Sequence, residues 1–145
     1  MENRKSVMII DQHPAFRKGL KELVERTSTY RFVAEAGSGQ EGMKLAREMV
    51  PDFVIMDYHL PDMNGMGVMR ELKRLTPPAK ILVLSASATY DHVTKALRAG
   101  ARGFATKNAI DGSCVEAMDT IDQGNYFLDD EVYQEVLIKM LTGSA

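Results

Sequence analysis

The fold of this chain is decided by one stretch, Pro51-Asp52-Phe53-Val54-Ile55-Met56-Asp57-Tyr58-His59-Leu60-Pro61-Asp62-Met63-Asn64-Gly65. Four apolar residues, 53–56, run directly into the carboxylate of Asp57, and a loop with proline, acid and Asn-Gly follows. A short apolar run bounded by turn residues is typical of a strand buried on both faces. Asp57 then lies at the carboxyl end of a strand, which is the edge where open α/β sheets bind ligands. A single acid there is more often a helix cap or a loop residue, so the rest of the chain decides its role.

The same alternation of a short apolar run and a helical pattern recurs on both sides of this stretch. Strands are expected at residues 7–10, 32–36, 53–56, 81–84 and 103–106, and each is followed by apolar residues at helical spacing. Short strands that alternate with helices predict βαβ units and a parallel sheet covered on both faces. Beyond Gly124, residues 125–128 are expected to form a connector, and apolar positions within 132–140 predict an extra helix.

Length and composition limit the classes of protein to consider. A chain of 145 residues suits one domain, and 45% hydrophobic with 26% charged residues is typical of a globular protein. The net charge of −2 gives no sign of nucleic-acid binding or of attraction to an anionic membrane. The one cysteine, Cys114, excludes an internal disulfide and fits a reducing compartment. The first apolar run is too short for a signal peptide and no run approaches a membrane span, so we expect a cytoplasmic protein with no membrane partner.

Four polar residues each come directly at the end of a different predicted strand: Asp11, Asp57, Ser85 and Lys107. Because the strands are parallel, these side chains are expected at one edge of the sheet. Two carboxylates indicate a hard cation such as Mg²⁺, and a lysine with a hydroxyl indicates an anion with several oxygens. Taken alone, Lys107 is a typical solvated loop residue and Ser85 a typical helix cap. Together the four residues predict an aspartyl-phosphate site.

These residues lie in motifs through which the chain resembles the receiver domain of bacterial two-component response regulators, over roughly residues 6–123. The motifs are Asp11-Gln12-His13-Pro14, Met56-Asp57 through Pro61 to Gly65, Val83-Leu84-Ser85, and Ala99-Gly100-Ala101-Arg102-Gly103-Phe104 through Lys107. The first motif is similar to the Asp-Asp-His-Pro of the branch with a LuxR-type helix-turn-helix output domain. Residues 124–128 also resemble the segment that leads from that receiver into its DNA-binding domain.

The resemblance implies an α/β fold of the flavodoxin-like kind. It has a doubly wound, five-stranded parallel sheet in the order 2-1-3-4-5 with five helices, here followed by a C-terminal helical extension. The implied division places the receiver domain at residues 1–123. Residues 124–145 are then a linker and an extra helix leading toward an output domain that this sequence does not include.

The resemblance also implies a role for each site residue. Asp57 is the phosphoacceptor, Ser85 hydrogen-bonds one phosphoryl oxygen, and Lys107 pairs with another. Asp11, Asp57 and the backbone carbonyl of His59 hold Mg²⁺. Phe104 is the switch aromatic that changes rotamer on activation, together with Ser85.

The implied partner is a sensor histidine kinase, and a homodimer is allowed. The implied output is control of transcription, and DNA is contacted only through the output domain. The domain is expected not to be an enzyme, beyond catalysing its own phosphorylation and dephosphorylation.

One residue departs from the family pattern, because Gln12 stands where the family has a second acid. An amide offers an oxygen ligand without charge, so Mg²⁺ binding is expected to be weaker. His13 is interpreted as a residue that flanks the helix start, and not as a metal ligand.

Three other functions remain open at this point. A pseudo-receiver acting only as an interaction module would explain Gln12. A phosphatase with an aspartate nucleophile usually has a second acid two residues later, as general acid, and His59 stands there instead. A flavin-binding module would be coloured when purified.

Overall fold

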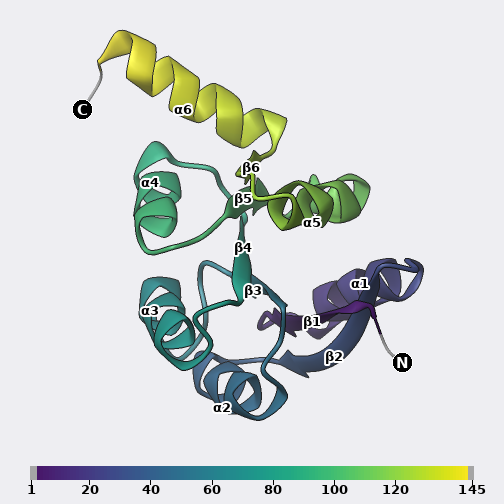
Figure 1. Ribbon diagram of the computed structural model, residues 1–145. Helices are drawn as coiled ribbons and strands as arrows, with labels where there is room; N and C mark the ends of the chain where they lie inside the picture. Colours follow the sequence, from purple (N-terminus) through teal and green to yellow (C-terminus); the bar gives the residue numbers. More distant parts are fainter. Residues whose placement is uncertain (1–2, 144–145) are drawn as a thin grey trace.

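The computed structural model describes residues 3–143, and within them the centre of the fold is a parallel sheet of six strands in the order β2-β1-β3-β4-β5-β6 (Figure 1). The strands are β1 Lys5–Ile10, β2 Tyr30–Ala36, β3 Phe53–Asp57, β4 Lys80–Ser85, β5 Gly103–Thr106 and β6 Phe127–Leu128. The helices are α1 Pro14–Glu25, α2 Gly39–Met49, α3 Gly65–Leu75, α4 Tyr90–Arg98, α5 Cys114–Asp122 and α6 Asp130–Thr142. The predicted class and the order of the first five strands are confirmed. The outermost residues of the two predicted domain ranges, 1–2 and 144–145, lie outside the described part.

Two local predictions differ from the structure. The expected connector at 125–128 contains β6, which pairs in parallel with β5 through Gly103↔Phe127 and Phe104↔Leu128. A strand of two residues has no periodicity, so only the tertiary contact with β5 defines it. The apolar residues expected at helical spacing after the fifth strand do not all lie in one helix: Ile110 is in a separate 3₁₀ turn over Ile110–Gly112, and α5 begins at Cys114.

Each face of the sheet has its own hydrophobic core. In Figure 1, α1 and α5 cover one face of the sheet, and α2, α3 and α4 cover the other. Residues of β3 alternate between the two cores: Phe53 and Ile55 pack on the side of α1 and α5, and Val54 and Met56 on the opposite side. Burial on both faces explains why this strand is apolar at every position before its final Asp57.

The loop from β3 to α3 is held close to the end of its own strand. The N–H of Gly65 donates to the carbonyl of Tyr58 at 3.2 Å. A Cβ atom at position 65 would meet that carbonyl oxygen at 2.5 Å, so only glycine allows this approach. The side chain of Asn64 caps α3 by accepting from the N–H of Met66 at 2.7 Å. The backbone next to Asp57 is therefore fixed from both sides.

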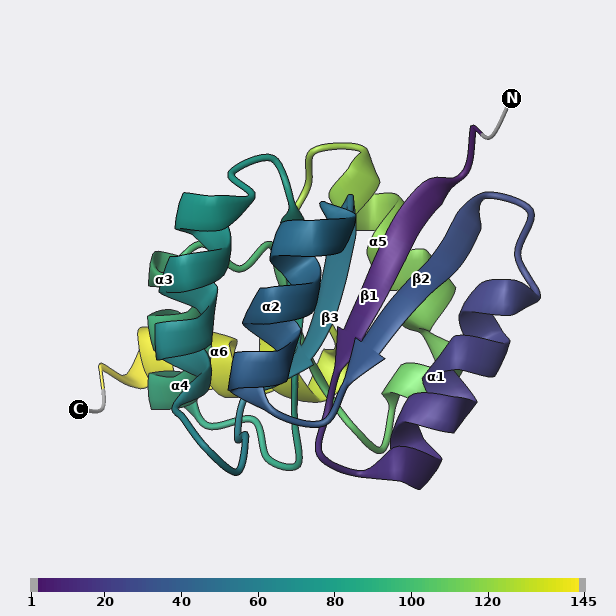
Figure 2. The same cartoon turned by 90° about the horizontal axis from the view of Figure 1, so that it is seen from below.

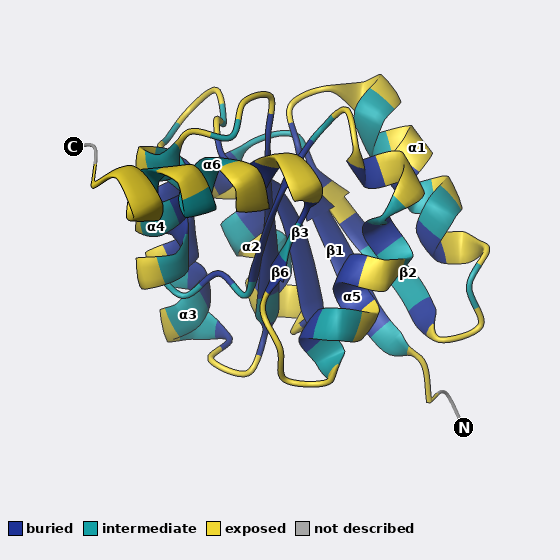
Figure 3. Cartoon of the chain, turned by 90° about the horizontal axis from the view of Figure 1, so that it is seen from above, coloured by how far each residue is buried: buried dark blue, intermediate teal, exposed yellow. Residues whose placement is uncertain are grey.

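Helix α6 is packed against the body of the domain near α4 and the edge of the sheet (Figure 1). Its Val132 is fully buried, in the same core as Phe104 of β5. Figure 3 shows that much of the helix remains exposed, whereas strands β1, β3, β4 and β5 are almost entirely buried. Among the helices in residues 3–143, none combines the length and apolar character that crossing a bilayer requires.

The buried carboxylate of Asp129 ties α6 to the sheet. Its Oδ1 accepts from the N–H of Val132 at 2.9 Å, which caps the first turn of α6. Its Oδ2 accepts from the N–H of Thr106 at 2.7 Å and from the hydroxyl of Thr106 at 3.0 Å. One side chain thus satisfies buried donors on the helix and on the last residue of β5.

We expect Asp129→Ala to lower the free energy of unfolding by about 2–4 kcal/mol. Loss of a helix cap costs about 0.5–2 kcal/mol, and leaving a buried backbone donor unsatisfied costs about 1–3 kcal/mol more. Ser38→Ala is the matched control, because Ser38 caps α2 by accepting from Glu41 at an exposed site and contacts no other strand through that bond. Urea unfolding of both variants gives the comparison. Equal losses in the two variants would show that the bond from Asp129 to Thr106 contributes nothing.

Candidate functional site

Side chains from four strand ends meet at the carboxyl edge of the sheet. Asp57 and Ser85 are the last residues of β3 and β4, and Asp11 and Lys107 directly follow β1 and β5. The sheet hydrogen bonding continues into the two following residues: Asp11 N–H donates to the carbonyl of Ala36 at 3.0 Å, and Lys107 N–H donates to that of Ser85 at 2.9 Å. Figure 2 shows β1 and β2 running toward this common edge. The backbone therefore fixes where all four side chains start.

The ammonium group of Lys107 lies between the two buried carboxylates. Its Nζ is 2.6 Å from Asp11 Oδ2 and 2.9 Å from Asp57 Oδ2. The side chains of Asp11 and Asp57 are only 2% and 4% exposed, and that of Lys107 is 16% exposed. Buried charges of one sign require compensation, and this lysine supplies it. The structure thus brings three of the four residues expected at this edge into contact.

The backbone holds the other oxygen of each carboxylate. Asp57 Oδ1 accepts from the N–H of His59 at 3.0 Å, and Asp11 Oδ1 accepts from the N–H of His13 at 2.8 Å. Both Oδ2 atoms are therefore left facing the Lys107 ammonium. The site combines carboxylates held by the backbone with a counter-charge on a long side chain.

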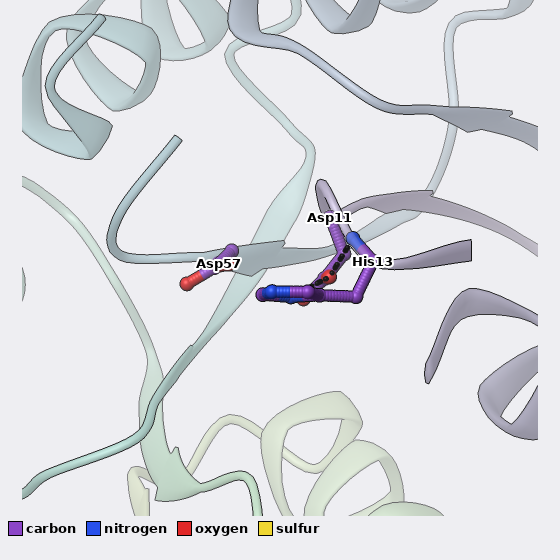
Figure 4. Close-up of side chains that lie close together, drawn as sticks. All are labelled: Asp11, His13 and Asp57. Atoms are coloured by element: carbon purple, nitrogen blue, oxygen red, sulfur yellow. Dashed lines mark hydrogen bonds and ion pairs between the residues drawn. The ribbon is translucent and has the colours of Figure 1, made fainter. Parts of the chain in front are cut away.

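His13 is part of this cluster, which the sequence interpretation did not include. Its Nδ1 lies 3.3 Å from Asp11 Oδ1 and 3.4 Å from Lys107 Nζ. Ligand atoms of Asp11, His13 and Asp57 all lie within 4.8 Å of one another (Figure 4). The sequence carries one sign of this contact: an imidazole lies two residues after Asp11, and the helix that begins at Pro14 directly follows it.

Gln12 does not join the carboxylates. Its side chain is exposed, and its Nε2 donates to the backbone carbonyl of His59 at 3.2 Å. That carbonyl is the one expected to be a metal ligand. Gln12 therefore contacts one expected metal ligand, the carbonyl of His59, and does not itself face the carboxylates.

Ser85 and Phe104 lie deeper than the charged residues. Ser85 is completely buried, and its Oγ accepts from the N–H of Ser87 at 3.3 Å. The ring of Phe104 is also fully buried, 6.1 Å from the ring of Tyr58, which in turn stacks on His92 of α4 at 4.5 Å. Burial raises the pKa of Tyr58 above its ordinary value. The rings of Phe104, Tyr58 and His92 thus form a row from β5 to α4, and Tyr58 directly follows Asp57.

A cavity of about 350 Å³ opens beside Asp57 and Lys107. Phe16 lines it on the α1 side, with its ring 4.7 Å from Lys107 Nζ in a cation–π contact. Gln12, His13 and His59 complete much of the rim. A small anionic group can thus enter beside Asp57 and meet the lysine.

The residues fit a divalent cation. Asp11 Oδ2 is buried, and no group in residues 3–143 donates a hydrogen bond of normal geometry to it; the Lys107 ammonium is its charge partner. Two fixed carboxylate oxygens that face one point are the hard ligands that Mg²⁺ prefers.

Comparison with known proteins agrees with this geometry. The family model described as the response regulator receiver domain matches residues 7–119. The chain is 31% identical over 132 residues to a nitrate/nitrite response regulator protein homolog of Haemophilus influenzae, covering 91% of this chain and 64% of the relative. It is 34% identical to the chemotaxis protein CheY of Thermotoga maritima, covering 82% of this chain and 98% of the relative.

A solved structure gives the same result. A two-component response regulator of the LuxR family from Aurantimonas sp. SI85-9A1 superposes with a TM-score of 0.90 at 32% identity, covering 95% of this chain and 99% of that one. The chain spans only 58–64% of the length of the first curated relatives that it matches. With the motifs, the strand order and the carboxylate–lysine cluster all in place, the chain belongs to the family of response regulator receiver domains.

Proposed function

We propose that the domain is a phosphorylation-controlled switch in which Asp57 accepts a phosphoryl group from a sensor histidine kinase. The observation that carries the proposal is the Lys107 ammonium, held 2.6 Å from Asp11 Oδ2 and 2.9 Å from Asp57 Oδ2. This arrangement supports a nucleophilic carboxylate with a counter-charge already beside it. Asp57 Oδ2 is the attacking atom, because Oδ1 accepts the N–H of His59.

In the proposed transfer, Asp57 Oδ2 forms a bond to phosphorus as the bond from phosphorus to the donor nitrogen breaks. The electron pair leaves with the imidazole of the kinase. Lys107 then pairs with an oxygen of the phosphoryl group, and the hydroxyl of Ser85 turns from Ser87 to donate to another. Asp11, Asp57 and the carbonyl of His59 would hold Mg²⁺, which neutralises charge on the phosphoryl group. Positioning and charge neutralisation supply most of the acceleration in such a step.

The proposed change of conformation runs from the pocket into the core. Movement of Ser85 toward the phosphoryl group would alter the space available to Phe104. Phe104 shares its core with Val132 of α6, and Thr106, between Phe104 and Lys107, is bound to Asp129. Two packings that differ by a few kcal/mol are sufficient for a switch. In this proposal α6 and α4 carry the signal outward.

The proposed division places the receiver domain at residues 1–123 and a linker with α6 at 124–145. In this view the whole protein continues into a DNA-binding output domain and controls transcription. The support is the likeness to a LuxR-family regulator and to the transcriptional regulatory protein DegU of Brevibacillus brevis, at 30% identity and 58% of that protein's length. The domain itself is proposed to catalyse only its own phosphorylation and dephosphorylation.

Two other functions have weaker support. A pseudo-receiver that only binds partners would not need Lys107 to contact both carboxylates. A phosphatase needs a general acid near the leaving group, and the exposed His59 occupies the position two residues after Asp57. Steady turnover of a phosphate ester would favour the phosphatase.

Intact mass after treatment with acetyl phosphate and Mg²⁺ tests the proposal. We expect one added phosphoryl group in the wild type and none in Asp57→Asn. Asp62→Asn is the control, because the carboxylate of Asp62 is exposed and bound to the N–H groups of Gly39 and Gln40 at 2.8 and 3.0 Å. Loss of label in Asp62→Asn with retention in Asp57→Asn would refute the assignment.

A further inference from the structure

The Lys107 ammonium marks a cation position with three surrounding ligand atoms. Asp11 Oδ2, Asp57 Oδ2 and His13 Nδ1 lie 2.6, 2.9 and 3.4 Å from its Nζ. The first two are oxygens and the third is an imidazole nitrogen. The positive charge here is thus surrounded by a mixed set of ligand atoms.

A second observation points to a metal ligand. The side chain of Asp11 is 2% exposed, and within residues 3–143 its Oδ2 receives no hydrogen bond of normal geometry although it faces the centre of the cluster. The site also has one acid fewer than the family motif, because Gln12 is neutral and its Nε2 is bound to the carbonyl of His59. This position therefore offers a carboxylate oxygen whose charge partner is the Lys107 ammonium, and an imidazole close by, but no second N-terminal acid.

We propose that His13 is a direct metal ligand through Nδ1, and that it shifts the metal preference of this pocket from Mg²⁺ toward later first-row transition ions such as Co²⁺. Imidazole nitrogen suits transition ions, whereas Mg²⁺ prefers oxygen. The inference rests on the proposed metal-binding function of the pocket and names the residue that tunes it. His13 takes the ligand role that the missing acid leaves vacant.

The local geometry allows His13 to do this. Its backbone N–H is fixed on Asp11 Oδ1 at 2.8 Å, while 63% of its side chain is exposed. The ring can therefore move toward a metal ion without disturbing the core. Lys107 would leave the position between the carboxylates, and its long side chain can follow an incoming phosphoryl group instead.

Titration calorimetry with Co²⁺ and with Mg²⁺ tests the proposal. Carboxylates alone already favour Co²⁺ over Mg²⁺. The test therefore compares the ratio of Co²⁺ to Mg²⁺ affinity in the wild type with the same ratio in a variant that lacks the imidazole of His13. We expect His13→Ala to weaken Co²⁺ binding by about 10- to 100-fold, because loss of even an outer-shell partner of a metal ligand has an effect of this size. Mg²⁺ binding should change by less than about threefold, because imidazole contributes little to it.

Two further variants separate ligation from packing. His13→Asn retains a polar side chain without an imidazole and should lose the Co²⁺ preference as His13→Ala does. His92→Ala removes a different imidazole, one that stacks on Tyr58 at 4.5 Å and is not part of the cluster with Asp11. It should leave the ratio of the two affinities unchanged.

The outcomes are distinct from those of the phosphorylation test. If His13→Ala weakens both ions equally, or weakens neither, His13 is not a selective ligand and the inference is wrong. Asp57 can still accept a phosphoryl group with Mg²⁺ in that case, which leaves the proposed function intact. If the wild type takes no phosphoryl group with any metal ion, the proposed function fails whatever His13 does.

Discussion

Lys107→Ala is expected to lower the free energy of unfolding of the metal-free protein by about 2–4 kcal/mol at neutral pH. The variant leaves the carboxylates of Asp11 and Asp57 buried together, at 2% and 4% exposure, without the cation between them. Removing one partner of a buried ion pair costs about 3–5 kcal/mol. The expected loss in Lys107→Ala is smaller than this, because the lysine side chain is 16% exposed and water can enter the space that it leaves.

Urea unfolding in the presence of a chelator and then of excess Mg²⁺ measures this effect. Mg²⁺ should restore most of the lost stability in Lys107→Ala, because it neutralises the same two carboxylates. The double variant Asp11→Asn with Lys107→Ala should be more stable than Lys107→Ala alone, because only one buried carboxylate remains. Lys95→Ala is the control: its ion pair with Asp91 is exposed at 58% and 67%, and such pairs contribute about 0.3–0.5 kcal/mol.

A loss in Lys107→Ala no larger than that in Lys95→Ala would contradict the role of Lys107 as the internal cation. Failure of Mg²⁺ to restore stability would show that the lysine and the metal occupy different places. The two results are independent, because one concerns the empty site and the other concerns the metal.

In the proposed switch, the position of Lys107 offers a route from the pocket to α6. Thr106 directly precedes Lys107. Its N–H and its hydroxyl donate to Asp129 Oδ2 at 2.7 Å and 3.0 Å. Asp129 caps α6 with its other oxygen. Lys107, proposed to bind the phosphoryl group, and Thr106, which the cap of α6 binds, are thus adjacent residues at the end of β5. A displacement of Lys107 therefore acts on a neighbour of the residue that anchors α6.

The features of the fold that could be predicted from the sequence are those with a strong local pattern. Residues 53–56 are apolar because both faces of β3 are buried, and this run is readable without any structure. The meeting of Asp11, Asp57 and Lys107 follows from the parallel direction of the strands. Strand β6 could not be predicted, because two residues carry no period. Its partner β5 lies 24 residues earlier, as in the pair Gly103 and Phe127, so only the pairing defines this strand.

Two side-chain contacts also could not be predicted from the sequence. The sequence places His13 beside the start of a helix, and only the folded turn into α1 shows that its ring faces Lys107. Asp129 is an ordinary helix cap by sequence, and its second bond, to Thr106, depends on how α6 packs on the sheet. In both cases the residue type was visible, but its partner came from a distant part of the chain.

Gln12→Asp is expected to tighten Mg²⁺ binding by about 10- to 100-fold, or about 1–3 kcal/mol. A new carboxylate next to the cation gains up to about 4 kcal/mol at contact for an effective dielectric near 20. The gain is partly offset because a third acid repels Asp11 and Asp57 in the empty site. The substitution also removes the amide that donates to the carbonyl of His59 at 3.2 Å, and so frees that oxygen for the metal.

Gln12→Asn is the matched control, because Asn and Asp have the same size and differ in charge. It also shortens the side chain and so reports the effect of freeing the carbonyl of His59 alone. Calorimetry with Mg²⁺ on all three forms separates the two contributions, and phosphorylation at limiting Mg²⁺ should follow the same order. If Gln12→Asp and Gln12→Asn bind Mg²⁺ equally well, charge at position 12 is irrelevant to the metal. The ligands would then be Asp11, Asp57 and their backbone neighbours alone, and the neutral residue would not weaken the site.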